Sequence, residues 1–229
     1  MRIDRDGAWK EVIERLLREF LAFFFPPVSR DIDWSRKPVF LDKELRKIAR
    51  ESETRKGIAD SLVQVWLRDG KPTWILIHIE VQEELRGKHR RSFPERMFTY
   101  RYRIFDRYRR EVASLALLTG KGASCPGIYR SGRWGSEVVF RFPVATLEPH
   151  RRDRKSLEGN PNPFALVVLA HLESQEKREP EDRFQWKFRL MRLLLERDYK
   201  RQTIMELLRF IDWLVILPSE MEKRLQQKI

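Results

Sequence analysis

The stretch ADSLVQVWLRDGKPTWILIHIEVQ, residues 59–82, contains two alternating runs of apolar and polar residues on either side of the tetrapeptide Asp69-Gly70-Lys71-Pro72. Residues 61–67 and 73–81 have the period-two pattern of β-strands, and the tetrapeptide has the composition of a tight turn. The stretch therefore predicts a β-hairpin.

The two faces of this hairpin differ in polarity, because side chains on a strand alternate between faces. One face is wholly apolar, which predicts that it is buried: Val63, Val65, Leu67, Ile75, Ile77, Ile79 and Val81. The other face gathers polar residues at the end away from the turn: Asp60, Gln64, His78, Glu80 and Gln82. A turn centred on Gly70 would place Asp60 directly opposite Glu80, and a two-residue turn would shift the pairing by one.

Two carboxylates opposed on a sheet repel each other, and a cation between them removes that repulsion. Oxygen ligands at this reach suit a hard ion, so we expect Mg²⁺, with Mn²⁺ as the alternative. Such an ion can polarise a phosphodiester and lower the pKa of a bound water. The competing interpretation is an ordinary solvated sheet face with unrelated polar residues.

Helical periodicity recurs outside the hairpin. The expected helices are residues 8–25, 93–109, 163–177, 182–198 and 200–217. Further strands are expected within residues 38–48, 111–118 and 137–142, and an irregular Gly-rich loop at 119–136. Pro26 and Pro27 end the first helix, and Asn162 caps the third with Pro163 in its first turn.

These elements predict an α/β protein with a mixed sheet. The expected divisions are a core of residues 1–147, a charged linker of residues 148–162, and a helical C-terminal annex of residues 163–229 that packs on the core.

The charge balance predicts a polyanionic partner. The chain has 47 basic and 34 acidic residues and a net charge of +13. Clustered Lys and Arg attract a phosphate backbone because they release its counterions. The alternative is that the surplus charge only keeps the protein in solution.

Cys125 is the single cysteine, which excludes an intrachain disulfide and a Cys-rich zinc ribbon. With four histidines and one cysteine, the composition disfavours zinc. The N-terminus lacks the apolar run of a signal peptide, and Phe20–Phe25 is far shorter than the roughly 20 residues that span a bilayer. We therefore expect a cytoplasmic, nucleoid-associated protein without a membrane partner.

Asp60, followed by a hydrophobic strand that ends in HIEVQ at 78–82, resembles the core signature of the PD-(D/E)XK nuclease superfamily in its E-x-Q variant. The wider pattern resembles the recombination-promoting nuclease/putative transposase (Rpn-like) family. The segments that carry this resemblance are FLDKEL at 40–45, ADSLV at 59–63, HIEVQ at 78–82, FPERMFTYRYRIFDRY at 93–108, NPFALVVLAHL at 162–172 and RFIDWLVILP at 209–218.

The resemblance implies a restriction-endonuclease-like αβββαβ core and a Mg²⁺-dependent DNA endonuclease. Asp60 and Glu80 would be metal ligands, and the backbone carbonyl of Val81 a third. Gln82 stands where the superfamily usually has Lys; its amide cannot act as a general base, but it can orient a water. Ala59 replaces the Pro of the superfamily name.

The resemblance also implies a further acid from the first helix. Glu11 and Glu14 both lie on the polar side of that helix, and we prefer Glu11 as a catalytic residue; a solvated surface position is the alternative for each. His78 would contact phosphate or orient a carboxylate, or be a hydrogen-bonded histidine of the sheet.

Helix 93–109 is the expected DNA-binding element. Its residues Arg96, Arg103 and Arg107 lie close to one face with Tyr100, and arginines there would contact phosphates. Tyr100 is interpreted as a core residue. The basic run at 151–155 is more typical of a solvated loop than of a phosphate site.

The expected partner is DNA, and a homodimer is compatible with the sequence. Two rival functions remain. One is a catalytically weak DNA-binding or scaffold protein that retains the nuclease fold, and the other is a protein–protein adaptor. Metal-dependent cleavage separates the first rival from a nuclease, and steep salt dependence of DNA binding would count against the second.

Overall fold

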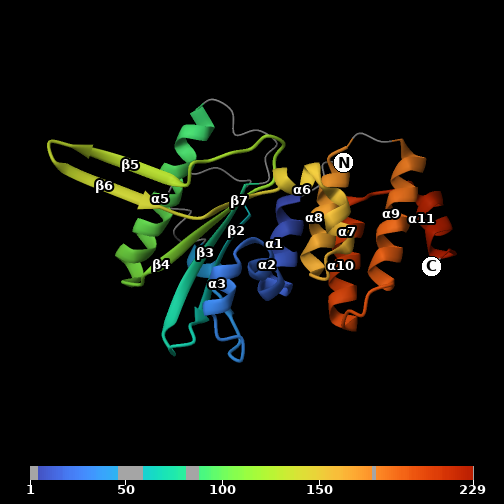
Figure 1. The fold of residues 1–229 in the computed structure, drawn as a ribbon, viewed down its shortest axis with the longest axis horizontal. Coiled ribbons are helices and arrows are strands. Elements are labelled where there is room, and N and C mark those ends of the chain that lie inside the picture. Colours follow the sequence, from blue (N-terminus) through green and yellow to red (C-terminus); the bar gives the residue numbers. More distant parts are fainter. Residues whose placement is uncertain (1–4, 46–58, 81–87, 177–178, 229) are drawn as a thin grey trace. The chain divides into compact units, whose positions relative to one another are not determined.

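The computed structural model describes residues 5–45, 59–80, 88–176 and 179–228. The chain forms two compact units, which we call the sheet unit (residues 24–148) and the helical unit (residues 1–23 and 149–229). Figure 1 shows the elements of both. Among the described residues, no helix combines the length and the apolar character that a membrane crossing requires.

A five-stranded mixed sheet in the order β1–β2–β3–β4–β7 forms the centre of the sheet unit. Its strands are β1 (Val39–Phe40), β2 (Ala59–Trp66), β3 (Pro72–Glu80), β4 (Val112–Leu118) and β7 (Val144–Thr146). The first three are antiparallel in succession, whereas β4 runs parallel to β3, and β7 runs parallel to β4. The predicted α/β class with a mixed sheet is confirmed.

The strand expected within residues 38–48 is present as β1, but it is short. Only β1 is extended there, and residues 42–45 are helical. Residues 46–48 lie outside the described residues.

The β2–β3 hairpin is present, but the predicted register is wrong. Asp60 pairs with His78 instead of Glu80, and Leu62 pairs with Leu76. Every pairing is therefore displaced by two residues from the one expected for a turn centred on Gly70. Because the displacement is even, each residue keeps its predicted face of the sheet.

The turn explains this displacement. The backbone amide of Gly70 donates to the Leu67 carbonyl at 2.8 Å, and the Leu67 amide donates to the Lys71 carbonyl at 2.9 Å. Gly70 has a φ of +84°, so it takes the left-handed position at the end of a three-residue loop, and Asp69 is the centre. A hydrogen bond donated by the Lys71 backbone amide lowers the pKa of the Asp69 carboxyl below its usual value.

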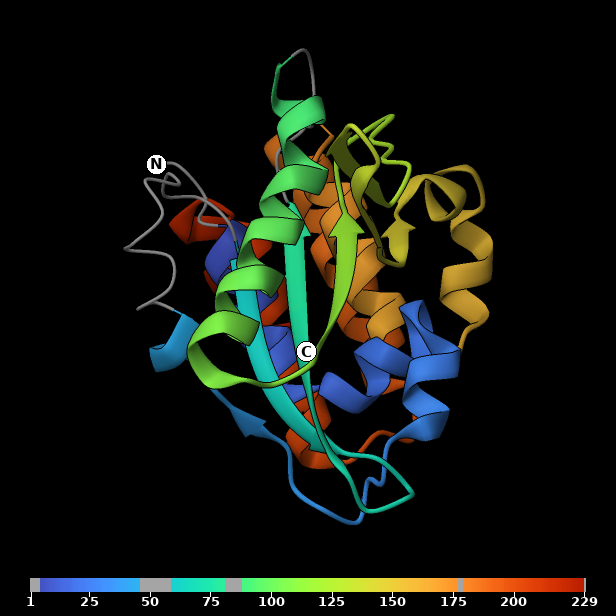
Figure 2. The same cartoon turned by 90° about the vertical axis from the view of Figure 1, so that its left-hand side faces the viewer.

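Helix α5 (Lys88–Tyr108) lies across one face of the sheet, in front of β2 and β3 and beside β4 in Figure 2. Near the β2–β3 turn it contributes to a cluster of Leu45, Leu62, Trp74, Tyr100, Ile104 and Val112. Toward the other end of the strands it contributes to a cluster of Phe93, Met97, Ala116, Leu118, Ala123, Phe140 and Phe142. The helix predicted at 93–109 is confirmed, and so is the assignment of Tyr100 to the core.

The opposite face of the β2–β3 hairpin is mainly apolar, with Ser61 and Thr73 as polar exceptions. Val63, Val65 and Ile75 on this face are buried, as the alternation predicts.

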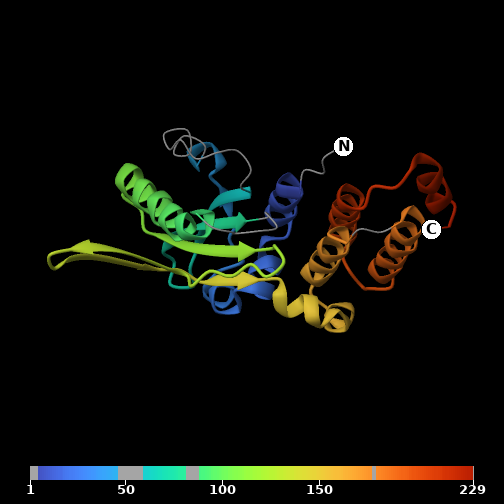
Figure 3. The ribbon, with the colours of Figure 1, turned by 90° about the horizontal axis from the view of Figure 1, so that it is seen from above.

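A second hairpin replaces part of the loop expected at 119–136. Strands β5 (Ile128–Arg133) and β6 (Ser136–Arg141) form a two-stranded antiparallel sheet of their own. In Figure 3 this ribbon extends away from the rest of the sheet unit. The loop prediction is wrong here because β5 is half-buried or exposed along its length, so it lacks the apolar alternation that identifies a strand.

The helical unit is built from short helices. They are α1 (Arg5–Arg15), α2 (Leu17–Phe24), α6 (Glu148–Arg152), α7 (Arg154–Gly159), α8 (Pro163–Ser174), α9 (Pro180–Leu195), α10 (Arg201–Leu214) and α11 (Ser219–Gln226). The single helix predicted at 8–25 is divided at Leu16, and α3 (Pro26–Asp31) begins at the prolines that end it.

The N-terminal helix packs with the C-terminal helices, although the sequence analysis groups it with the sheet. Trp9 on α1 is fully buried, and its Nε1 donates to Nδ1 of His171 on α8 at 3.0 Å. Its ring also lies against Phe164 on α8 and Phe210 on α10, with centroids 6.1 and 6.0 Å away.

The segment expected to be a linker at 148–162 contains α6 and α7. Asp153 starts α7, since its side chain accepts from the Ser156 amide at 3.2 Å. The start predicted for the next helix is confirmed: Asn162 accepts from the Phe164 amide at 2.8 Å, and Pro163 lies in the first turn.

Candidate functional site

The candidate acidic residues lie on two neighbouring strands of the sheet unit. Asp60 belongs to β2 and Glu80 to β3, and the structure describes both through the backbone of these strands. Asp60 pairs with His78, so Glu80 lies two residues further along β3 and on the same face. The structure thus brings Asp60, His78 and Glu80 to one end of one face, in a diagonal arrangement.

At this end of the sheet, the neighbouring residues on β4 are apolar and buried. In the parallel pairing of β3 with β4, His78 is beside Ala116 and Glu80 is beside Leu118. Ala116 and Leu118 are fully buried in the cluster formed with Phe93 of α5. The candidate residues therefore share the face that α5 covers.

Gln64 has a structural role on this face. Its Oε1 accepts a hydrogen bond from Nε1 of the buried Trp74 at 2.9 Å. Because a buried indole N–H needs an acceptor, Gln64 stabilises the core under α5.

The other residues predicted for the metal and catalytic site are Val81, Gln82 and Glu11. Val81 and Gln82 lie outside the described residues. Glu11 is half-buried on α1 and belongs to the helical unit, whereas Asp60 and Glu80 belong to the sheet unit. Among the side chains that the structure describes, no group of three or more His, Cys, Asp and Glu is gathered in a way that could hold a metal ion.

The predicted DNA-binding arginines lie along one flank of α5. Arg96 and Arg103 are half-buried, and Arg107 is exposed. Their spacing of seven and four residues keeps them on one side of the helix, next to its buried stripe. The other flank faces the β5–β6 hairpin, because Phe98 stacks on Tyr129 with ring centroids 4.9 Å apart.

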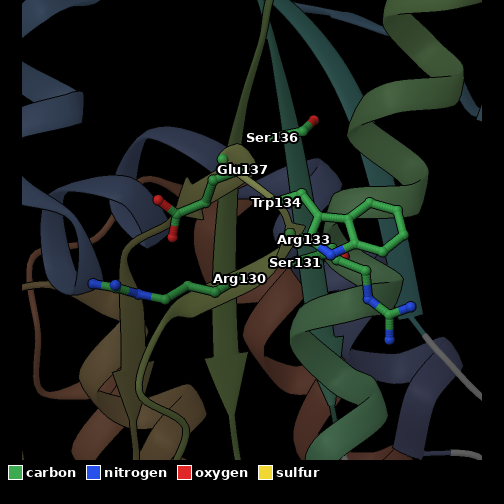
Figure 4. A pocket seen from close by; sticks show the side chains of 8 residues that line it. Arg130, Ser131, Arg133, Trp134, Ser136 and Glu137 are labelled. Atoms are coloured by element: carbon green, nitrogen blue, oxygen red, sulfur yellow. The ribbon is translucent and has the colours of Figure 1, made fainter.

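The tip of the β5–β6 hairpin carries residues that the sequence analysis does not identify. A shallow hollow there is lined by residues 130–137 (Figure 4). In this view Arg130 and Glu137 extend to one side, and Trp134 and Arg133 extend to the other. The overlooked signal is the pair Trp134-Gly135 between two six-residue segments, a two-residue hairpin turn with Gly at its second position.

Comparison of the chain with family models, curated proteins and solved structures gave no match.

Proposed function

We propose that the chain is a Mg²⁺-dependent DNA endonuclease with a restriction-endonuclease-like core, of the recombination-promoting nuclease type. The observation that carries this proposal is the register of β2 and β3, which places Asp60 and Glu80 on the same face of adjacent antiparallel strands. The element order supports it. The antiparallel strands β1, β2 and β3 are followed by helix α5 and then by β4, which runs parallel to β3, as in the βββαβ part of such a core.

The donor set fits a hard divalent cation. Diagonal neighbours on adjacent strands lie roughly 7–8 Å apart, a separation that an Asp and a Glu carboxylate can bridge together. Mg²⁺ is typically bound through one or two carboxylates and keeps several waters, and Mn²⁺ accepts the same oxygen ligands. Asp60 and Glu80 would hold the ion, with the carbonyl of Val81 as a further ligand.

Hydrolysis adds a water oxygen to phosphorus and breaks one phosphorus–oxygen ester bond, and the leaving oxygen takes up a proton. A bound ion would supply Lewis-acid polarisation of the phosphate and a lower pKa for the attacking water. The Gln82 amide would orient that water by hydrogen bonds. The arginine flank of α5 would bind the phosphate backbone on either side of the scissile bond.

Plasmid nicking tests the proposal. The purified full chain, incubated with supercoiled plasmid, should convert it to open circles with Mg²⁺ or Mn²⁺ and leave it intact in EDTA. Salt-dependent DNA binding without nicking in either metal would instead support a DNA-binding or scaffold protein that has lost catalysis.

The net charge of +13 leads to a second prediction, on DNA affinity. Arg96→Ala/Arg103→Ala should weaken binding about equally for unrelated duplex sequences and flatten the slope of log affinity against log salt by about one unit per lost phosphate contact. Fluorescence anisotropy of a labelled duplex in EDTA, over a salt series, measures both effects.

The matched control for this prediction is Arg68→Ala/Arg201→Ala, which removes the same charge at exposed positions that do not belong to α5. If the two double variants have equal slopes of log affinity against log salt, Arg96 and Arg103 do not contact duplex DNA. A flat salt dependence of the wild-type chain would support the adaptor function.

A further inference from the structure

The β5–β6 hairpin is packed only at its base. There, Phe140 is buried, and Tyr129 stacks on Phe98 of α5. From Arg130 to Val139 every residue is exposed. Figure 1 shows the ribbon crossing α5 and extending away from it. A two-stranded ribbon without a packed face is marginally stable in water, so its outer half gains little from the fold itself.

The turn places a large aromatic residue where a small one is favoured. Trp134 and Gly135 have φ values of +54° and +87°, the left-handed pair of a two-residue hairpin turn. Asn-Gly is the usual sequence there, and a bulky residue in this conformation is strained. Trp134 is also 94% exposed. Neither burial nor backbone preference accounts for a tryptophan at this tip, which points to a ligand outside the chain.

Two more exposed aromatic residues lie on α5, on the flank that faces the hairpin. Tyr102 is 56% exposed and stacks against Phe98 with centroids 6.3 Å apart, and Phe105 is 44% exposed. Phe98 in turn stacks on Tyr129 of the hairpin. Aromatic side chains therefore continue from the C-terminal half of α5 onto the ribbon.

Arginines accompany these aromatic rings. The guanidinium of Arg133 lies 5.3 Å from the Trp134 ring centroid, and that of Arg109 lies 5.8 Å from the Phe105 ring centroid. Arg101 lies over Phe140 at the base of the hairpin, 5.6 Å from its centroid. Exposed aromatic faces next to guanidinium groups offer stacking for bases and positive charge for phosphates, as in proteins that bind single strands.

We propose that the hairpin and the adjoining flank of α5 form a binding surface for single-stranded DNA, which we call the ribbon surface: Phe98, Arg101, Tyr102, Phe105, Arg109, Tyr129, Arg133 and Trp134. Trp134 and Tyr102 stack on bases, and Arg109 and Arg133 contact phosphates. The choice of DNA as the polyanion rests on the proposed function, while the preference for unpaired bases comes from the exposed rings. The arginines of the nuclease prediction, Arg96 and Arg103, lie on the other flank of α5.

Trp134→Asn is the decisive variant. Asn-Gly favours the same turn conformation, so the hairpin should be retained while the stacking ring is lost. We expect the affinity for a labelled 20-mer of deoxythymidine, measured by anisotropy in EDTA, to fall about tenfold, or about 1.4 kcal/mol. The salt slope should stay unchanged because no charge is removed. Trp134→Phe should restore most of the affinity.

Three further variants complete the test. Tyr102→Ser should also weaken binding of the 20-mer several-fold, whereas Leu195→Ala, which removes an exposed apolar side chain from α9, should leave it unchanged. Arg133→Ala should reduce the salt slope by about 0.7, the value for one phosphate of a single strand.

The proposal is overturned if Trp134→Asn and Tyr102→Ser both bind the 20-mer within twofold of wild type, or if the wild-type chain does not bind it at low salt. A protein ligand would then be the better occupant of the ribbon surface. All these binding measurements are made in EDTA, so they do not depend on catalysis. A chain that fails to nick plasmid can still bind the 20-mer through the ribbon surface, and a chain that nicks normally can still fail to bind it.

Discussion

Asp60→Asn and Glu80→Gln are each expected to lower Mg²⁺-dependent plasmid nicking at least about a hundredfold, equivalent to about 2.7 kcal/mol of transition-state stabilisation. Each substitution nearly preserves side-chain volume and removes one carboxylate charge. An ion that has lost one of two anionic ligands binds more weakly and is placed less precisely against the phosphate. Single-turnover nicking at saturating Mg²⁺ gives the rate.

Glu111→Gln is the control for this loss. Glu111 is exposed just before β4, and the substitution makes the same change of charge in the same unit. It should nick plasmid at the wild-type rate. If Asp60→Asn or Glu80→Gln also retains that rate while folding normally, the site assignment is wrong.

DNA binding without metal separates chemistry from affinity in these variants. Asp60→Asn removes a negative charge next to the expected position of the scissile phosphate. In EDTA its affinity for duplex DNA should therefore equal or exceed that of the wild-type chain. A variant that loses both binding and cleavage would indicate damage to the fold instead of loss of a metal ligand.

Gln82 distinguishes water orientation from charge in the same assay. The leucine of Gln82→Leu has no hydrogen-bonding group, so this variant should lose most of its nicking activity. Gln82→Lys should retain part of the activity, because the superfamily that the sequence resembles usually has Lys at this position. An unchanged single-turnover rate for Gln82→Leu would remove this residue from the proposed mechanism.

The sequence predicts the existence of the β2–β3 hairpin better than its register. The alternation of apolar and polar residues is a local property of residues 61–67 and 73–81, so the sequence alone is enough to predict the two strands. The register depends on which loop position takes the left-handed conformation, and Asp69-Gly70 is compatible with turns of two and of three residues. Only the backbone of Gly70 decides between them. The candidate pair Asp60 and Glu80 thus keeps its predicted face but changes from opposed to diagonal.

Two features could not be predicted from local sequence: the packing of α1, which depends on residues distant in the chain, and the β5–β6 hairpin, which has no packed face over its outer half. The apolar stripe of α1 predicts a buried face, yet the acceptor of the Trp9 N–H is His171, 162 residues along the chain. The outer half of the β5–β6 hairpin is exposed on both faces and lacks alternation. Its turn chemistry at Trp134-Gly135 is the one local signal, and this signal alone does not reveal the exposed ring.

A buried charge in the helical unit leads to the largest expected effect on stability. Lys187 lies on the apolar stripe of α9, between Phe184 and Leu190, and is 1% exposed. Its Nζ lies 2.6 Å from a carboxylate oxygen of Glu222 on α11 and 2.9 Å from one of Asp212 on α10. A buried ammonium without a counter-charge is strongly destabilising, so these two carboxylates are required for the packing of all three helices.

Asp212→Ala/Glu222→Ala should therefore lower the free energy of unfolding by about 3–5 kcal/mol, because it leaves the Lys187 ammonium buried and uncompensated. Lys187→Met should cost far less, within about 1.5 kcal/mol, since Met fills a similar volume. The acids freed by that substitution return to water, because the Asp212 side chain is already 58% exposed and that of Glu222 35%.

Urea denaturation of the full chain at neutral pH, followed by circular dichroism, measures these differences. Glu220→Ala is the control: its side chain is 85% exposed and pairs with Lys223 at 3.6 Å, so its loss should change stability by less than about 0.5 kcal/mol. The double acid variant should lose more free energy of unfolding than Lys187→Met, because only the former leaves a buried charge without a partner. If the Lys187→Met chain is less stable than the double acid variant, the prediction is wrong. The charge of Lys187 would then itself stabilise the helical unit, beyond being neutralised by Asp212 and Glu222.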